Sequence, residues 1–77
     1  MTYQCPGLNG IDADRVRNID HAARLFAHRL ARKMFGRGGQ AFRVARVRHG
    51  HDWVQYEADI GKRRGPRTRT MLTVSRR

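Results

Sequence analysis

Residues 20–35 carry the clearest pattern in the chain, because one apolar stripe runs through them at helical spacing. Apolar side chains recur every three or four residues from Ala22 to Met34. Asp20 is placed to cap the first turn, and Gly36 to end the helix. A helix with a single apolar stripe needs another apolar surface to cover, so the remaining segments must supply that surface. The opposite, polar side of the helix carries His21, Arg24, His28 and Arg32.

The segments that follow predict strands rather than a second helix. Residues 53–60 alternate strictly between apolar and polar side chains, which is typical of a strand with one buried face. Residues 41–48 are rich in β-branched and apolar side chains, but their alternation slips, which predicts a bulge near Val44 and Ala45. Residues 68–75 alternate again. Three antiparallel strands are therefore expected after the helix.

Turn residues complete the expected layout. Glycine turns at 49–52 and 61–67 would join the three strands as hairpins. Residues 15–19 are interpreted as a short strand that leads into the helix. The prediction is an α+β fold in which one helix (about 20–35) packs on a three- to four-stranded antiparallel sheet. Residues 1–77 are expected to form a single small basic domain, which would bury only about 60% of its unfolded surface.

The charge of the chain is strongly one-sided. Lys and Arg number 17 against 6 Asp and Glu, a net charge of +11, and 15 of the 17 are arginine. Residues 21–51 hold eight basic residues and no acid, and seven more basic residues follow Asp59 with no acid. A surface that serves only solubility mixes both signs. The distribution therefore indicates an anionic partner, whose phosphate or carboxylate oxygens match the guanidinium fork.

The expected contact residues lie on the polar side of the helix, on the strands and in the loop 62–67. That loop combines four cations with glycine and proline, and a basic hairpin tip of this kind can straddle a phosphate ladder. Trp53 begins its strand on the polar face, where it would either cap the sheet edge or contact a partner. The expected nucleic-acid or partner contacts are Arg24, His28, Arg32, Lys33, Arg37, Arg46, Arg48, Trp53, Lys62, Arg63, Arg64, Arg67 and Arg69.

Neither a metal site nor a catalytic residue is predicted, and no cofactor is expected. No histidine pair has the i, i+4 spacing of a helical zinc site, and the single cysteine, Cys5, allows no disulfide or thiolate pair within the chain. Cys5 is expected to be a free thiol without a role. His49 or His51 with Glu57 would supply the acid and base of a small ribonuclease toxin. Glu57 on a regular strand is better explained as a cross-strand partner of arginine.

Three segments carry the layout of the chain and cover about half of it: NIDHAARLFAHRLARKMFG, WVQYEADIG and TRTMLTVS. Their order and spacing resemble one group of very small phage anti-CRISPR proteins. The resemblance implies a protein that acts without catalysis, docks on the CRISPR surveillance complex and perturbs its binding of target DNA. Many such inhibitors are acidic DNA mimics, whereas this chain is basic. That difference favours contact with guide RNA, target DNA or an acidic protein patch, and no site residue carries over by motif.

The leading hypothesis is a non-enzymatic binding protein of phage or mobile-element type, with inhibition of a CRISPR surveillance complex as its most specific form. The alternative is an autonomous, sequence-nonspecific DNA- or RNA-binding protein, which would complete its small core as a homodimer. A small ribonuclease toxin is the third hypothesis. No apolar run approaches the roughly 20 residues that a membrane span needs, and no signal-peptide pattern opens the chain. We therefore expect no membrane partner and a cytoplasmic location, in the host cell if the protein is phage-encoded.

Overall fold

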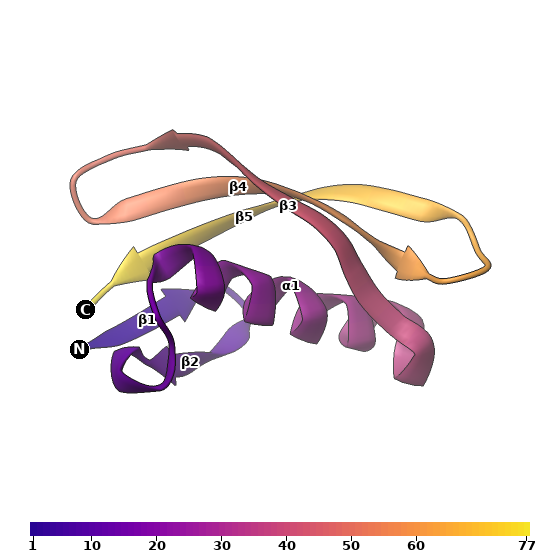
Figure 1. Ribbon diagram of the computed structural model, residues 1–77, viewed down its shortest axis with the longest axis horizontal. Helices are drawn as coiled ribbons and strands as arrows, with labels where there is room; N and C mark the ends of the chain where they lie inside the picture. The colour runs from indigo at the N-terminus through magenta and orange to yellow at the C-terminus, as the bar shows by residue number, and fades with distance from the viewer.

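One helix lies across one face of a five-stranded antiparallel sheet (Figure 1). The computed structural model describes residues 1–77. The α+β class is confirmed, with five strands rather than three or four, in the order β2-β1-β5-β4-β3. The elements are β1 (Thr2–Cys5), β2 (Leu8–Asp12), α1 (Ile19–Phe35), β3 (Gly39–His49), β4 (Trp53–Lys62) and β5 (Arg67–Arg76), with 3-10 turns at Ala13–Arg15 and Gly36–Gly38.

The additional strands come from the first twelve residues, which form the hairpin β1–β2. Gly7 makes its turn possible, because its φ of 79° lies in the left-handed region that favours glycine. β1 then pairs with β5, the last strand of the chain, and so extends the sheet. The prediction of a short strand at 15–19 is wrong, because this stretch ends a 3-10 turn and begins α1.

The N-cap of α1 is Asn18, not Asp20 as the sequence predicted. The Asn18 side-chain oxygen accepts a hydrogen bond from the His21 N–H at 2.9 Å, which satisfies one free amide of the first turn. Asp20 lies one residue inside the helix, where its carboxylate binds side chains from the sheet instead. The predicted C-cap at Gly36 is confirmed, with a φ of 77°.

The core lies between α1 and the inner face of the sheet. Its largest fully buried side chains are Tyr56, Phe26, Ile60 and Val74. Met34, expected in the apolar stripe, is instead 52% exposed. The small side chains of the helix let it approach the strands closely. The fully buried positions of α1 are Ala22, Ala23, Phe26, Ala27 and Ala31.

Strand β3 forms a free edge of the sheet and contains two bulges. The register shifts between Ala41 and Arg43, and again between Arg46 and Arg48. The single bulge predicted near residues 44–45 is therefore misplaced, because this pair lies in regular register with β4. Bulges increase strand twist, and Figure 1 shows β3 bending across the sheet and along α1.

The outer face of the sheet carries no helix (Figure 1). Arg69 on β5 binds Glu57 at 2.9 Å and Asp59 at 3.4 Å on this face, which confirms the expected pairing of Glu57 with an arginine. The turn between β4 and β5 lies beside the C-terminal end of α1, because Gly39 pairs with Lys62. Both chain termini lie at the opposite end of the molecule (Figure 1).

Candidate polyanion-binding groove

Three adjoining hollows follow one another along α1, on the flank where the helix meets strand β3. The hollow at the helix N-terminus has a volume of about 420 Å³, the central one about 400 Å³ and the C-terminal one about 510 Å³. Neighbouring hollows share Arg24 and His28 as lining residues. We refer to the three together as the α1–β3 groove. Its basic and histidine lining residues are Arg17, His21, Arg24, His28, Arg29, Arg32, Arg37 and Arg43.

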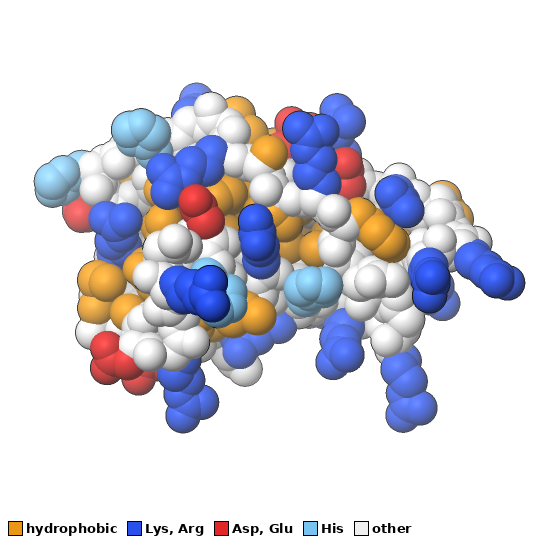
Figure 2. Space-filling view, viewed as in Figure 1, with side chains coloured by type: hydrophobic (Ala, Val, Ile, Leu, Met, Phe, Trp, Pro, Cys, Tyr) orange, Lys and Arg blue, Asp and Glu red, His pale blue; other side chains and the backbone are white.

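Helical spacing places the central lining residues in one row. His21, Arg24, His28 and Arg32 are separated by three, four and four residues. Residues at these separations lie on one side of a helix, about 5–6 Å apart at their Cβ atoms. Strand β3 forms the other wall of the central and C-terminal hollows. Figure 2 shows basic side chains along this side of the molecule and beyond the end of α1, with few acidic side chains among them.

Both histidines of the groove use the same ring nitrogen, Nδ1, to accept a backbone hydrogen bond. His28 Nδ1 accepts a hydrogen bond from the Ala41 N–H at 3.3 Å, and His21 Nδ1 accepts one from the Arg17 N–H at 3.2 Å. A neutral imidazole that accepts at Nδ1 carries its proton on Nε2. Each ring therefore offers an N–H donor for an anion. The His28 bond also joins α1 to the free edge of β3.

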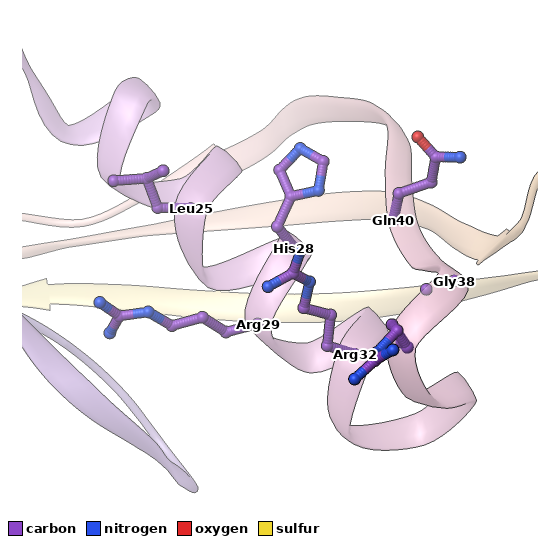
Figure 3. A pocket seen from close by; sticks show the side chains of 8 residues that line it. Leu25, His28, Arg29, Arg32, Gly38 and Gln40 are labelled. Carbon is purple, nitrogen blue, oxygen red and sulfur yellow. The ribbon is translucent and has the colours of Figure 1, made fainter.

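The C-terminal hollow shows how the two walls face each other (Figure 3). His28 rises from α1 between the helix and β3, and Gln40 stands on the facing strand. Arg32 turns back along the helix toward His28, whereas Arg29 extends away from the hollow. The Arg29 guanidinium donates to the Asn9 carbonyl oxygen at 3.0 Å. Arg32 and His28 are thus the residues best placed to hold a ligand here.

Asp20 is the only acidic side chain in the groove, and it is already partnered. Its Oδ1 accepts hydrogen bonds from the Tyr56 hydroxyl at 2.6 Å and from Arg46 Nε at 2.7 Å. Burial alone would raise the pKa of Asp20, but these two bonds and the charges of Arg46 and Arg24 outweigh burial and lower it. Burial and the bond to Asp20 raise the pKa of Tyr56. Asp20 therefore forms its ion pair with Arg46, and none of the cations that line the groove lies within ion-pair distance of it.

Most of the positive charge has no acidic partner. Of the 17 Lys and Arg side chains, only Arg46 and Arg69 lie within 4.0 Å of a carboxylate. Both of these arginines were expected to contact a partner, and both are occupied within the fold. The arginines that line the groove form no ion pair, so a polyanion would not have to displace an acidic side chain from them.

The structure places seven of the expected contact residues along the groove and in the turn beside its C-terminal end. Four of them line the groove, and the other three belong to the turn beside its C-terminal end. The Lys62 side chain lies beside Gly38, which lines the C-terminal hollow. We refer to residues 62–67 as the basic tip. The seven residues are Arg24, His28, Arg32, Arg37, Lys62, Arg63 and Arg64.

Three more of the expected contacts lie away from the groove and the basic tip. Lys33 points to the opposite flank of α1, where its Nζ donates to the Gly7 carbonyl at 3.3 Å. Arg48 donates to the Gln55 side chain at 2.8 Å. The half-buried Trp53 indole packs on Gly50 of the β3–β4 turn, which favours an edge cap over a contact residue. Arg67, within the basic tip, lies over the Phe42 ring, with 3.8 Å between its Cζ and the ring centroid.

The sequence prediction omitted four of the basic and histidine residues that line the groove, together with one aromatic residue: Arg17, His21, Arg29, Arg43 and Phe42. Arg17 and His21 continue the helical spacing backward from Arg24, so that periodicity could have identified them. Arg43 and Phe42 depend on the first bulge of β3, whose position the sequence did not reveal.

The residues considered for a ribonuclease do not converge. His49 pairs with Val54 of β4, and the Val54 side chain is buried on the face of the sheet that the helix covers. Glu57 pairs with Ala45 and lies on the opposite, outer face. His51 lies in the turn with 97% of its side chain exposed.

The structure shows no cluster of three or more His, Cys, Asp or Glu side chains arranged for a metal ion. Cys5 is a buried free thiol, and its pKa is raised by burial, which a backbone hydrogen bond at Thr73 only partly offsets.

Comparisons with protein-family models, with curated proteins and with solved structures found no match to this chain. The one helix of the fold is too short and too polar to cross a bilayer.

Proposed function

We propose that this protein binds nucleic acid through the α1–β3 groove and the basic tip, without reading base sequence and without catalysis. The observation that carries the proposal is the row of unpaired arginines and Nε2–H histidines along a groove whose only carboxylate is already balanced. Arginine and imidazole N–H groups are donors that match phosphate oxygens. A periodic row of such donors suits the periodic phosphates of a nucleic-acid backbone.

The absence of base specificity follows from the kind of contact proposed. Contacts to phosphate fix the position of a protein on nucleic acid, but they carry no sequence information. Such binding releases counterions from the ligand and weakens steeply with salt. A nucleoprotein complex offers the same phosphates, so inhibition of a CRISPR surveillance complex is the more specific form of this proposal.

Fluorescence anisotropy with labelled random oligonucleotides, from low salt to about 0.15 M, tests the proposal. The groove variant carries Arg24→Ala, Arg32→Ala and Arg43→Ala. The matched control carries Arg15→Ala, Lys33→Ala and Arg76→Ala, and loses the same three charges away from the groove. We expect the groove variant to lose about tenfold or more in affinity and to lower the slope of log affinity against log salt by about 2–3. The control should change both far less.

Equal losses in the two triple variants would show that net charge rather than the groove attracts the ligand, and would contradict the proposed site. Wild-type protein that releases bare oligonucleotides at about 0.15 M salt would contradict autonomous binding. In that case the inhibitor hypothesis still makes its own prediction. The wild-type protein should form a stoichiometric complex with the nucleoprotein target, and the groove variant should not.

A further inference from the structure

We propose that the groove takes single-stranded nucleic acid and that one unpaired base stacks on the paired side chains of Phe42 and Arg67. This inference rests on the proposed function and deepens it, because it names the class of nucleic acid. Phe42 lines the central hollow together with Arg24, His28 and Arg43. The Arg67 guanidinium lies over the Phe42 ring, 3.8 Å from its centroid.

The first bulge of β3 explains why an aromatic ring stands at the rim of the groove. Ala41 pairs with Ile60, whose side chain faces the helix, whereas Arg43 pairs with Asp59 on the outer face. Phe42 lies between them with no partner on β4. Phe42 lines the central hollow and also contacts Arg67, whose side chain passes over Gly61 of β4 to reach the ring. A regular strand would have committed the ring to one face.

The contact orients the guanidinium for stacking. Arg67 is exposed, whereas Phe42 is half-buried. The ring holds the inner side of the planar guanidinium by a cation–π contact, and the outer side faces solvent. Unpaired bases stack on aromatic rings and on arginine planes of this kind. The resulting order would be ring, guanidinium and base, next to the cations that hold the adjoining phosphates.

Single strands fit this arrangement better than a duplex. The cations of the groove form one row between a helix and an edge strand, which suits one backbone rather than two. A duplex keeps its bases stacked on one another, so none would be free to cover Arg67.

The test compares four ligands at the same salt: a random single-stranded RNA, the same sequence as single-stranded DNA, the matching DNA duplex and inorganic polyphosphate. Polyphosphate supplies the charge without bases. Phe42→Leu removes the ring, and Arg67→Lys keeps the charge but removes the plane. Arg76→Lys, an exposed change on β5 near the chain terminus and away from the groove and the basic tip, is the control for the second change. Thermal unfolding of each variant confirms that it folds.

We expect the wild type to prefer one or both single strands over the duplex. Phe42→Leu and Arg67→Lys should each weaken single-strand binding by about fivefold to one-hundredfold, as loss of one stacked base does. Their affinity for polyphosphate should stay within about twofold of wild type, because phosphate contacts alone bind it. Arg76→Lys should behave as wild type on all four ligands. A preference for RNA over DNA would support stacking with an added contact to the 2′-hydroxyl.

Two outcomes would overturn the inference without touching the proposed function. One is a wild type that binds the duplex as tightly as either single strand. The other is an Arg67→Lys protein that keeps its full single-strand affinity, or that loses polyphosphate binding equally. In both cases the triple variants of the groove still decide whether the groove binds nucleic acid.

Discussion

Asp20 shows how one side chain can shape both the fold and the groove. Its carboxylate joins three elements, since it belongs to the first turn of α1 and accepts bonds from Arg46 on β3 and Tyr56 on β4. It also lies near the positive end of the helix dipole, which favours a carboxylate there. The same group gives Tyr56, a buried core residue, a partner for its hydroxyl.

Asp20→Asn should change stability in a pH-dependent way. The lowered pKa of Asp20 means that its contribution is complete above about pH 4, the range of an unfolded aspartate, and is lost as pH falls through the folded value. We expect the variant to lose about 1 kcal/mol of unfolding free energy at neutral pH, a modest figure because the side chain is half exposed. Urea unfolding between about pH 7 and pH 2 would show its difference from wild type shrinking in acid.

Asp14→Asn is the matched control, because its exposed carboxylate has no ion-pair partner. Asp20→Asn should also tighten nucleic-acid binding, since it frees Arg46 and removes the one acid of the groove. A loss of stability that stays constant across the pH range would contradict the role given to the Asp20 charge.

At the scale of elements, the close approach of α1 to the start of β3 builds the C-terminal hollow. A Cβ atom at Gly39 would overlap the carbonyl group of Ala31, whereas one at Gly38 would meet nothing nearer than 3.8 Å. Gly39→Ala should therefore push the helix and strand apart and cost about 1–3 kcal/mol of unfolding free energy. Gly38→Ala should cost far less, and urea unfolding of the two variants compares them directly. Similar losses in both would contradict this account of the packing.

The sequence predicted those elements that carry their own periodicity. The helix and the last three strands each contain enough residues for the periodicity of their apolar side chains to be recognised, and each is present in the structure. The hairpin β1–β2 was missed because strands of four and five residues are too short to show one. Asn18 and Asp20 are both good N-caps, and pairing with the sheet decides between them. The slip in residues 41–48 predicted irregularity but not its position, so Phe42 and Arg43 could not be placed in the groove.

At the scale of the whole molecule, a body 36 Å long, the groove runs along α1 and meets the basic tip at its C-terminal end. A ligand that occupies the groove should continue over the tip, provided that it is long enough. Arg63→Ala with Arg64→Ala should then lower the salt slope for a single strand by about 1, and at most by about 1.4. Arg76→Ala with Arg77→Ala removes the same charge at the opposite end and should leave the slope nearly unchanged (Figure 1).

Oligonucleotide length gives the tip variant its own test. We expect its defect to vanish on oligonucleotides too short to leave the groove, about 4–5 nucleotides, and to appear as length increases. Both double variants should unfold within about 0.5 kcal/mol of wild type, as exposed substitutions do. A defect of equal size at every length would mean that the tip acts on the ligand only through long-range charge.

The pairing of the first strand with the last has a consequence for the order in which the chain folds. The helix and the meander β3–β4–β5 join segments that are close in sequence, whereas β1 meets β5 through Tyr3–Arg76 and Gln4–Ser75. Joining residues so far apart in sequence has the largest entropic cost of loop closure, so these contacts form late. The hairpin β1–β2 should then dock last during folding and detach first in local opening. Cys5 is the last residue of β1 and is buried in the core, so the rate of its alkylation reports how often this part of the native protein opens.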